Sequence, residues 1–77
     1  MSERVLIINA DDLGYDPAVS EGILTAMRQG VVSSATLIVN SPHAPDAAAR
    51  VGDAAVGLHL NLARFKPLWA GFPSELL

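Results

Sequence analysis

The sequence has 77 residues, enough for one small domain, and its 51% hydrophobic and 17% charged residues argue against intrinsic disorder. It contains no cysteine, which excludes disulfide bonds and thiolate metal sites and favours a reducing, cytoplasmic location. The net charge is -3 and the five basic residues are scattered along the chain, so no nucleic-acid-binding surface is expected.

The first predicted element is a short strand from Val5 to Ile8. Its apolar residues do not alternate with polar ones and are mostly β-branched, which is typical of a strand buried on both faces. The run is too short for a signal peptide core or a membrane span, so neither is expected. A polar loop is predicted from Asn9 to Tyr15.

A helix is predicted after this loop, over residues 17–29. Asp16 and Pro17 are typical of an N-cap and a first helical residue, and Gly30 is typical of the position just past a helix end. Apolar residues recur between these signals at helical spacing, which predicts one buried face.

The second half of the chain repeats this pattern. Thr36 to Val39 form another apolar run, the alanine-rich stretch from Ala44 to Arg50 predicts a second helix, and Ala55 to Leu62 predict a third strand. The order is therefore strand, helix, strand, helix, strand. This order predicts an α/β fold with a parallel sheet and helical crossovers.

Three parallel strands would leave apolar surface and a strand edge uncovered, and both drive association. We therefore expect residues 1–77 to form a single partial domain. Two explanations stay open: the chain is part of a longer parent, or a homo-oligomer completes the sheet through the open edge.

Two acidic residues and one histidine are candidates for a metal site. Asp11 and Asp12 follow the first predicted strand, and His59 lies near the end of the third. Because the carboxyl ends of parallel strands meet at one edge, these side chains are expected to converge. Carboxylate and imidazole groups suit a divalent metal ion such as Mg or Zn, and an unbound carboxylate can act as a base. A solvated acidic loop and a hydrogen-bonded core histidine remain as alternatives.

Three stretches resemble the opening motifs of a known family: Asn9–Gly14, Gly30–Asn40 and Val56–Leu62. In this order they are similar to the YdjC-like carbohydrate deacetylases, and the resemblance runs from about Val5 to Pro67. It implies an irregular (β/α) barrel of the glycoside hydrolase and deacetylase type, of which this chain would be the N-terminal βαβαβ part. It also implies a metal-dependent hydrolase that removes acetyl groups from N-acetylated amino sugars, such as those of chitooligosaccharides.

The resemblance also implies roles for particular residues. Asp12 and His59 would bind the metal and Asp11 would act as the catalytic base, although the two aspartates could exchange roles. Asn40 and Asn61 lie within the motif segments and would bind substrate.

The chain departs from the family pattern at two points. Family members are much longer, and a second metal-binding histidine and the acid that protonates the leaving amine come from later strands. We therefore expect these 77 residues to be inactive alone. The segment Arg64-Phe65-Lys66 stands where the family usually has a small turn that contains glycine.

Two other functions compete with a deacetylase. A non-catalytic remnant could bind metal, or only pair with a partner through its open edge. A receiver-like signalling module also carries an acidic pair that binds Mg after its first strand. It needs a phosphate-accepting aspartate at the end of the third strand, where this chain has His59 and Asn61.

Overall fold

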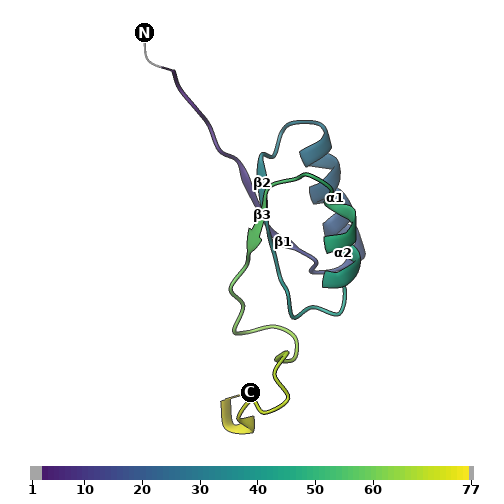
Figure 1. Cartoon of the computed structure of the whole chain (residues 1–77), viewed down its shortest axis with the longest axis vertical. Coiled ribbons are helices and arrows are strands. Elements are labelled where there is room, and N and C mark those ends of the chain that lie inside the picture. Colours follow the sequence, from purple (N-terminus) through teal and green to yellow (C-terminus); the bar gives the residue numbers. More distant parts are fainter. Residues whose placement is uncertain (1–2, 77) are drawn as a thin grey trace.

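A computed structural model describes residues 3–76 as one parallel sheet with two helices packed on the same side of it (Figure 1). The elements in chain order are β1 (Asn9–Leu13), α1 (Pro17–Arg28), β2 (Ser34–Leu37), α2 (Ala44–Arg50), β3 (Val56–Leu58) and a 3-10 turn, η1 (Ser74–Leu76). The strands lie in the order β1-β2-β3, and both pairs are parallel. The predicted α/β class with a parallel sheet and helical crossovers is confirmed.

The predicted position of the first strand is wrong, because β1 occupies Asn9–Leu13 rather than Val5 to Ile8. The predicted loop from Asn9 to Tyr15 is therefore mostly strand. Its neighbour explains the shift: β2 begins at Ser34, which pairs with Asn9, so the residues before Asn9 have no neighbouring strand among the described residues. Val5 to Ile7 instead extend away from the sheet with exposed side chains, and Ile8 is hydrogen-bonded to Ser33 and Ser34 at the start of β2 (Figure 1).

The third strand is shorter than predicted, because it spans only Val56–Leu58 of the stretch from Ala55 to Leu62. The ladder ends where β2 ends, at the bond that the His59 N–H donates to the Leu37 carbonyl over 3.0 Å. Beyond this bond the chain has no strand partner among the described residues. His59 therefore lies directly after the last residue of β3.

The helices match their predictions closely. The carboxylate of Asp16 caps α1 by accepting a 2.7 Å hydrogen bond from the Val19 N–H, and α2 has the predicted bounds. Glu21 of α1 forms an ion pair with Arg50 of α2, and this guanidinium lowers the pKa of the Glu21 carboxyl. The pair joins the exposed sides of the two helices.

The core lies between the sheet and the helices. Its fully or almost fully buried members are Leu13, Leu24, Ala35 and Ala47. They come from β1, α1, β2 and α2 in turn, so each of these elements contributes one residue to the same cluster.

The turn from β1 into α1 is held by buried serines. The Gly14 N–H donates to Ser20 Oγ over 2.9 Å, and the Ser41 hydroxyl donates to the Gly14 carbonyl. Gly14 has φ 87, and a Cβ placed there would lie 3.0 Å from Leu37 Cδ1, so glycine is required by both conformation and space. This turn fixes the end of β1, where the two aspartates lie.

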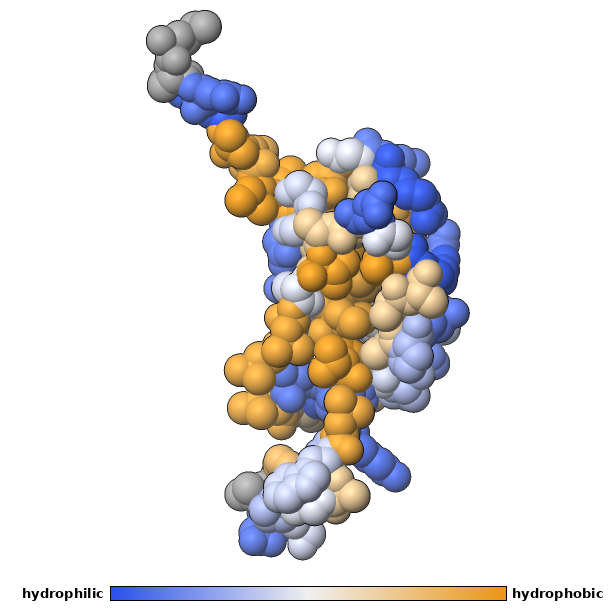
Figure 2. All heavy atoms as spheres, viewed as in Figure 1, coloured by the Kyte–Doolittle hydropathy of each residue, from blue (hydrophilic) through white to orange (hydrophobic). Residues whose placement is uncertain are grey.

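Much apolar surface remains exposed (Figure 2). It gathers along the segment before β1 and around the chain that follows β3, where the most exposed large residues are Leu60, Leu62, Leu68 and Trp69. The predicted homo-oligomer through an open edge stays a prediction. No helix in the described part of the chain is long and apolar enough to cross a membrane.

Candidate functional site

The site is built on an irregularity in β1. Ala10 pairs with Ala35 and Leu13 pairs with Leu37, so two residues of β1 lie opposite the single residue Thr36. This is a β-bulge, and its extra residue is Asp12, which has φ 76. A positive φ is unfavourable for a residue with a side chain, but aspartate tolerates it better than most.

The bulge determines where the two aspartates point. In a regular strand, adjacent side chains point to opposite faces, so one carboxylate would enter the core. Here Ala10 and Leu13 both pack in the core, although three positions separate them. Asp11 and Asp12 therefore both stay out of the core, and both side chains are exposed.

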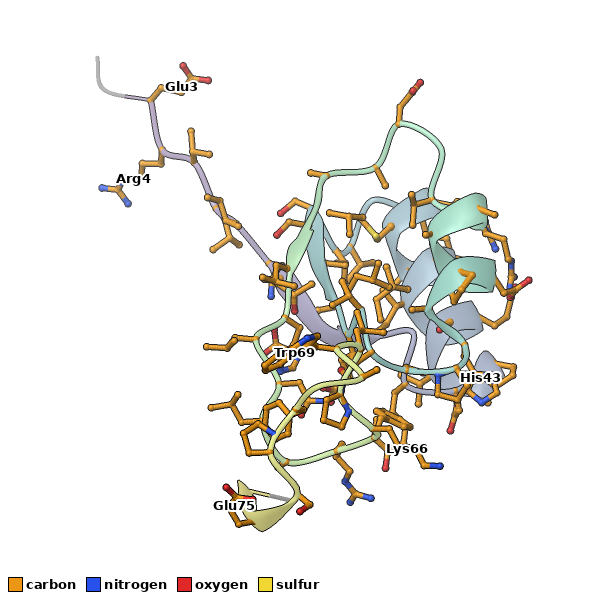
Figure 3. The ribbon with its side chains drawn as sticks, turned by 60° about the horizontal axis from the view of Figure 1, so that its bottom comes forward. Glu3, Arg4, His43, Lys66, Trp69 and Glu75 are labelled. Carbon is orange, nitrogen blue, oxygen red and sulfur yellow. The ribbon has the colours of Figure 1, made fainter. Side chains whose placement is uncertain are left out.

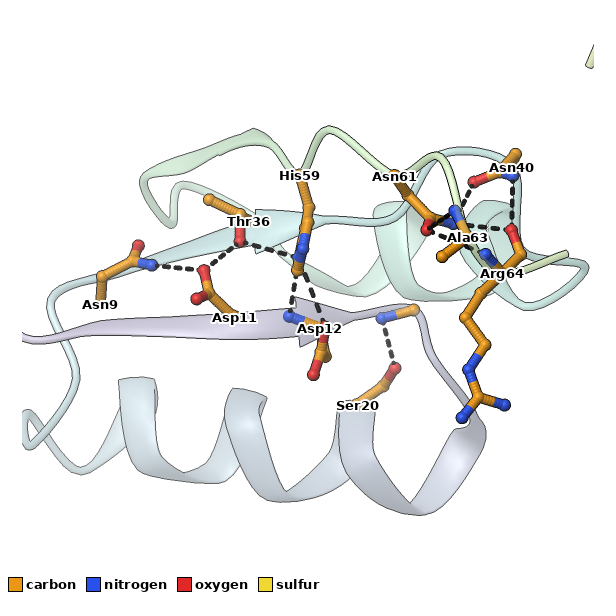
Figure 4. Close-up of polar contacts among 11 residues, drawn as sticks. Asn9, Asp11, Asp12, Ser20, Thr36, Asn40, His59, Asn61, Ala63 and Arg64 are labelled. Carbon is orange, nitrogen blue, oxygen red and sulfur yellow. Dashed lines mark hydrogen bonds and ion pairs between the residues drawn. The ribbon is translucent and has the colours of Figure 1, made fainter. Parts of the chain in front are cut away.

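Asp11 is held by two neighbours through one of its oxygens. Asp11 Oδ1 accepts a hydrogen bond of 2.7 Å from the Thr36 hydroxyl and one of 3.0 Å from Asn9 Nδ2 (Figure 4). Both donors project from the sheet face that carries no helices. The two bonds orient the carboxylate through Oδ1 and leave Oδ2 without a hydrogen bond to the described residues.

Asp12 and His59 are direct neighbours across the end of the sheet. The Asp12 N–H donates to His59 Nδ1 over 3.3 Å, and Asp12 Oδ1 lies 3.4 Å from the same nitrogen (Figure 4). Thr36 Oγ1 is 3.5 Å from this nitrogen as well. Because Nδ1 accepts from the Asp12 N–H and the single Thr36 proton is given to Asp11, neither atom has a hydrogen for the other, so Thr36 contacts the imidazole without a hydrogen bond to it. Thr36 thus bonds Asp11 and lies beside His59.

This donor set fits a divalent metal ion. Carboxylate oxygen and neutral imidazole nitrogen are both ligands for such ions. Asp12 Oδ1 lies 3.4 Å from His59 Nδ1, and because this nitrogen accepts the Asp12 N–H, a metal ion would have to displace that bond or bind the other ring nitrogen. Within residues 3–76 no group of three His, Cys, Asp or Glu residues could hold a metal, so this pair needs further ligands.

Asn40 and Asn61 lie together near this edge but are occupied with the backbone. Asn61 Nδ2 donates to Asn40 Oδ1 over 3.1 Å, and both side chains bond the turn that follows Asn61. Both also line a hollow of about 230 Å³ that includes His59. Their predicted role in substrate binding stays a prediction.

A larger hollow of about 320 Å³ lies elsewhere, between α1 and α2. Its lining combines apolar side chains with Arg28 and Arg50 and includes no carboxylate or histidine among the described residues. The smaller hollow is lined by His59, although not by Asp11 or Asp12, and we take it as the candidate site because His59 contacts Asp12.

Sequence reasoning missed Thr36 and Asn9 as members of the site. The sequence pattern marks Thr36 only as part of an apolar strand, and Asn9 only as part of a loop. Alternation along β2 is the signal that could have identified Thr36, since Ala35 and Leu37 pack toward the core and Thr36 must then point the other way.

Comparison with known proteins places the chain within a described family. A family model described as "YdjC-like protein" matches residues 5–76. A carbohydrate deacetylase from Enterococcus faecalis is 48% identical over 83 aligned positions, which cover 100% of this chain and 30% of that protein. A chitooligosaccharide deacetylase from Klebsiella pneumoniae is 47% identical, with 88% of this chain and 28% of that protein covered.

A solved structure agrees with these similarities. The crystal structure of an Enterococcus faecalis protein described as a cellobiose-phosphate cleavage protein matches with a TM-score of 0.74 and 44% identity. The match covers 90% of this chain and 28% of that one. The chain thus spans less than a third of the length of each of these three relatives.

Proposed function

This chain belongs to the YdjC-like family, and from that premise we propose that it supplies the metal-binding and base half of a carbohydrate N-deacetylase site. The reaction is hydrolysis of the acetamide of an N-acetylated amino sugar. The names of the relatives from Enterococcus faecalis and Klebsiella pneumoniae support a carbohydrate substrate, and the second supports chitooligosaccharides.

The observation that carries the proposal is the meeting of Asp11, Asp12 and His59 at the carboxyl end of the sheet. The bulge keeps both carboxylates out of the core, and His59 reaches Asp12 from the end of β3. Ligands of parallel α/β folds bind at this end of the strands.

Asp12 and His59 are the residues proposed to hold a divalent cation, either Zn²⁺ or Mg²⁺. When bound, such a cation would supply Lewis-acid chemistry, because it polarises a carbonyl and lowers the pKa of water. The Asp12 N–H donates to His59 Nδ1 and so orients the imidazole ring.

Asp11 is proposed to act as the general base. Its Oδ1 is fixed by Thr36 and Asn9, so Oδ2 is the oxygen that takes a proton from the water attacking the acetamide carbon. The bond between that carbon and the sugar nitrogen then breaks, and acetate leaves. The sugar amine needs a proton from an acid that the family resemblance assigns to residues beyond this chain.

Two rival functions, an interaction fragment and a receiver-like module, receive different support from the structure. The exposed apolar segment from Val5 to Ile8 favours an interaction fragment, because such surface is normally covered by a partner or by more chain. A receiver-like module has less support, since His59 follows β3 at the position where a phosphate-accepting aspartate would stand. The cytoplasmic location stays a prediction.

A chimera tests the proposed function. The chain would replace its counterpart in the Enterococcus faecalis carbohydrate deacetylase, with which it shares 48% identity. We expect this chimera to release acetate from di-N-acetylchitobiose in the presence of Zn²⁺ or Mg²⁺, and to stop when a chelator removes the metal. A folded chimera that releases no acetate, while the unaltered relative does, would leave the chain as a non-catalytic fragment.

A further inference from the structure

The turn after β3 is tied to the end of β2 by two side-chain amides. Asn40 Nδ2 donates to the carbonyls of Arg64 and Lys66, over 3.0 and 3.3 Å. Asn61 Nδ2 donates to Asn40 Oδ1 over 3.1 Å and to the Arg64 carbonyl over 2.8 Å (Figure 4). The Arg64 carbonyl therefore accepts from both amides.

The hydrogen-bonding capacity of Asn61 is fully used. Its Oδ1 accepts from the N–H groups of Ala63 and Arg64, over 3.2 and 3.1 Å, and its two amide hydrogens are donated as well. A side-chain amide offers two hydrogens and two lone pairs, so no capacity remains. Backbone N–H groups can only donate, which fixes the orientation of this amide. Asn61 cannot bind a sugar hydroxyl without giving up a bond to the turn.

The turn needs this support because its backbone is strained. Phe65 has φ 64, a conformation that favours glycine, and it stands where the resembled family usually places a turn that contains glycine. The Phe65 ring packs edge-on against Tyr15 with centroids 5.7 Å apart, and the Arg64 guanidinium lies 5.7 Å from the Tyr15 centroid. The amides hold the backbone of the turn, and Tyr15 holds its side chains.

The turn and the two amides form one wall of the hollow beside His59. Asn40, Asn61 and Pro67 all line this hollow of about 230 Å³. Residues 62–66 do not line the hollow, and the side chain of Lys66 extends outward in Figure 3, so the turn acts on the hollow through Asn40, Asn61 and Pro67. The conformation of the turn therefore sets the shape of the space next to His59.

We infer that Asn40 and Asn61 are positioning residues, which hold residues 61–67 in the strained turn that shapes the sugar-binding wall beside His59. The inference rests on the proposed function for the identity of the ligand, but the conformational part stands on the hydrogen bonds alone. It differs from the sequence-based prediction, in which both asparagines contact substrate. A positioning role and a substrate-binding role predict different results in two experiments: substitution of each asparagine by alanine, and observation of the side-chain amide signals when sugar is added.

The test is nuclear magnetic resonance of the isotope-labelled chain and its Asn40→Ala and Asn61→Ala variants. A residue with positive φ gives a strong cross-peak between its own amide and Hα protons, and Phe65 is expected to show it in the parent. We expect both variants to lose this cross-peak, and Asn9→Ala, an asparagine that contacts Asp11 instead, to keep it. If Asn61→Ala fails to fold, Asn40→Ala carries the test, because it leaves the bonds from Ala63 and Arg64 to Asn61 in place.

Two further titrations separate this inference from the proposed function. Zn²⁺ is expected to shift the amide signals of Asp12 and His59 equally in the parent and in Asn40→Ala, while di-N-acetylchitobiose binds the variant at least several-fold more weakly. A Phe65 cross-peak that survives in both variants would overturn the inference, as would sugar-induced shifts centred on the side-chain amides of Asn40 and Asn61. If Zn²⁺ shifted no amide signals of the parent, the proposed function would be contradicted instead. The Phe65 cross-peak would still decide whether the two asparagines position the turn.

Discussion

Replacing Asp11 with asparagine in the chimera is expected to lower the rate of acetate release by about 10²- to 10⁴-fold, the usual contribution of a general base. The new side chain has nearly the same shape, and its oxygen can still accept from Thr36 Oγ1 and Asn9 Nδ2, the two donors that orient Asp11. An amide nitrogen cannot take a proton from water, so the chemical step fails while the fold stays intact. The measurement is acetate release from di-N-acetylchitobiose at saturating metal.

Asp53→Asn is the matched control, because Asp53 is exposed and lies outside the site. It makes the same change of charge and should leave the rate within about two-fold of the parent, an effect of less than about 0.5 kcal/mol. If both variants lost activity to the same extent, the loss would reflect net charge or folding. If Asp11→Asn kept the full rate, Asp11 would not be the base, and the exchanged assignment, with Asp12 as base, would be tested next.

Replacing Leu13 with alanine is expected to cost about 2 to 5 kcal/mol of unfolding free energy, the range for a buried leucine. Leu13 is 0% exposed and lies in the core cluster with Leu24, Ala35 and Ala47. A chain of this length has a total stability of about 4 to 12 kcal/mol, so the variant should lose a large part of it and unfold at a clearly lower urea concentration. Urea denaturation followed by circular dichroism measures the change.

Leu62→Ala makes the same substitution at a side chain that is 90% exposed, and it should change the free energy by less than about 0.5 kcal/mol. If Leu13→Ala and Leu62→Ala unfolded at the same urea concentration, the core around Leu13 would not be the main source of the unfolding free energy. Leu13→Ala is also expected to disturb the position of Asp12, because Leu13 directly follows Asp12 and pairs with Leu37 at the end of the bulge.

The helices are predictable from sequence because their signals are local. Asp16, Pro17 and Gly30 mark the ends of α1 through capping and backbone preference, and neither signal depends on distant residues. The alanine-rich α2 has the expected bounds although its N-cap residue His43 makes no capping bond, because the helix preference of alanine is also local. The parallel arrangement then follows from the order of elements, since two strands joined by a helix pair in parallel.

The strand boundaries are not predictable in the same way, because they depend on partners. Val5 to Ile8 have stronger strand preferences than Asn9–Leu13, yet only the latter lie beside β2. The same dependence shortens β3, which ends where its neighbour β2 ends. Sequence pattern reports which residues prefer an extended backbone, but it does not report which of them have a neighbour.

The site is predictable in outline but not in its mechanism of assembly. The convergence of Asp11, Asp12 and His59 follows from their positions at strand ends, and the structure brings them together. Nothing local in the sequence indicates the bulge at Asp12, because its cause is the packing of both Ala10 and Leu13 into the core. The bulge is what keeps both carboxylates out of the core, and Thr36 bonds Asp11 while it lies beside His59.

The central claim is that Asp12 and His59 bind a divalent metal ion together, and a calorimetric titration of Zn²⁺ and Mg²⁺ into the chain tests it most directly. The account predicts binding of one ion to the parent. Folded Asp12→Ala and His59→Ala variants should each bind more weakly by at least the roughly 10- to 100-fold that is lost when only a hydrogen-bonding partner of a metal ligand is removed. A parent that binds neither ion, or variants that bind as tightly as the parent, would contradict the metal site.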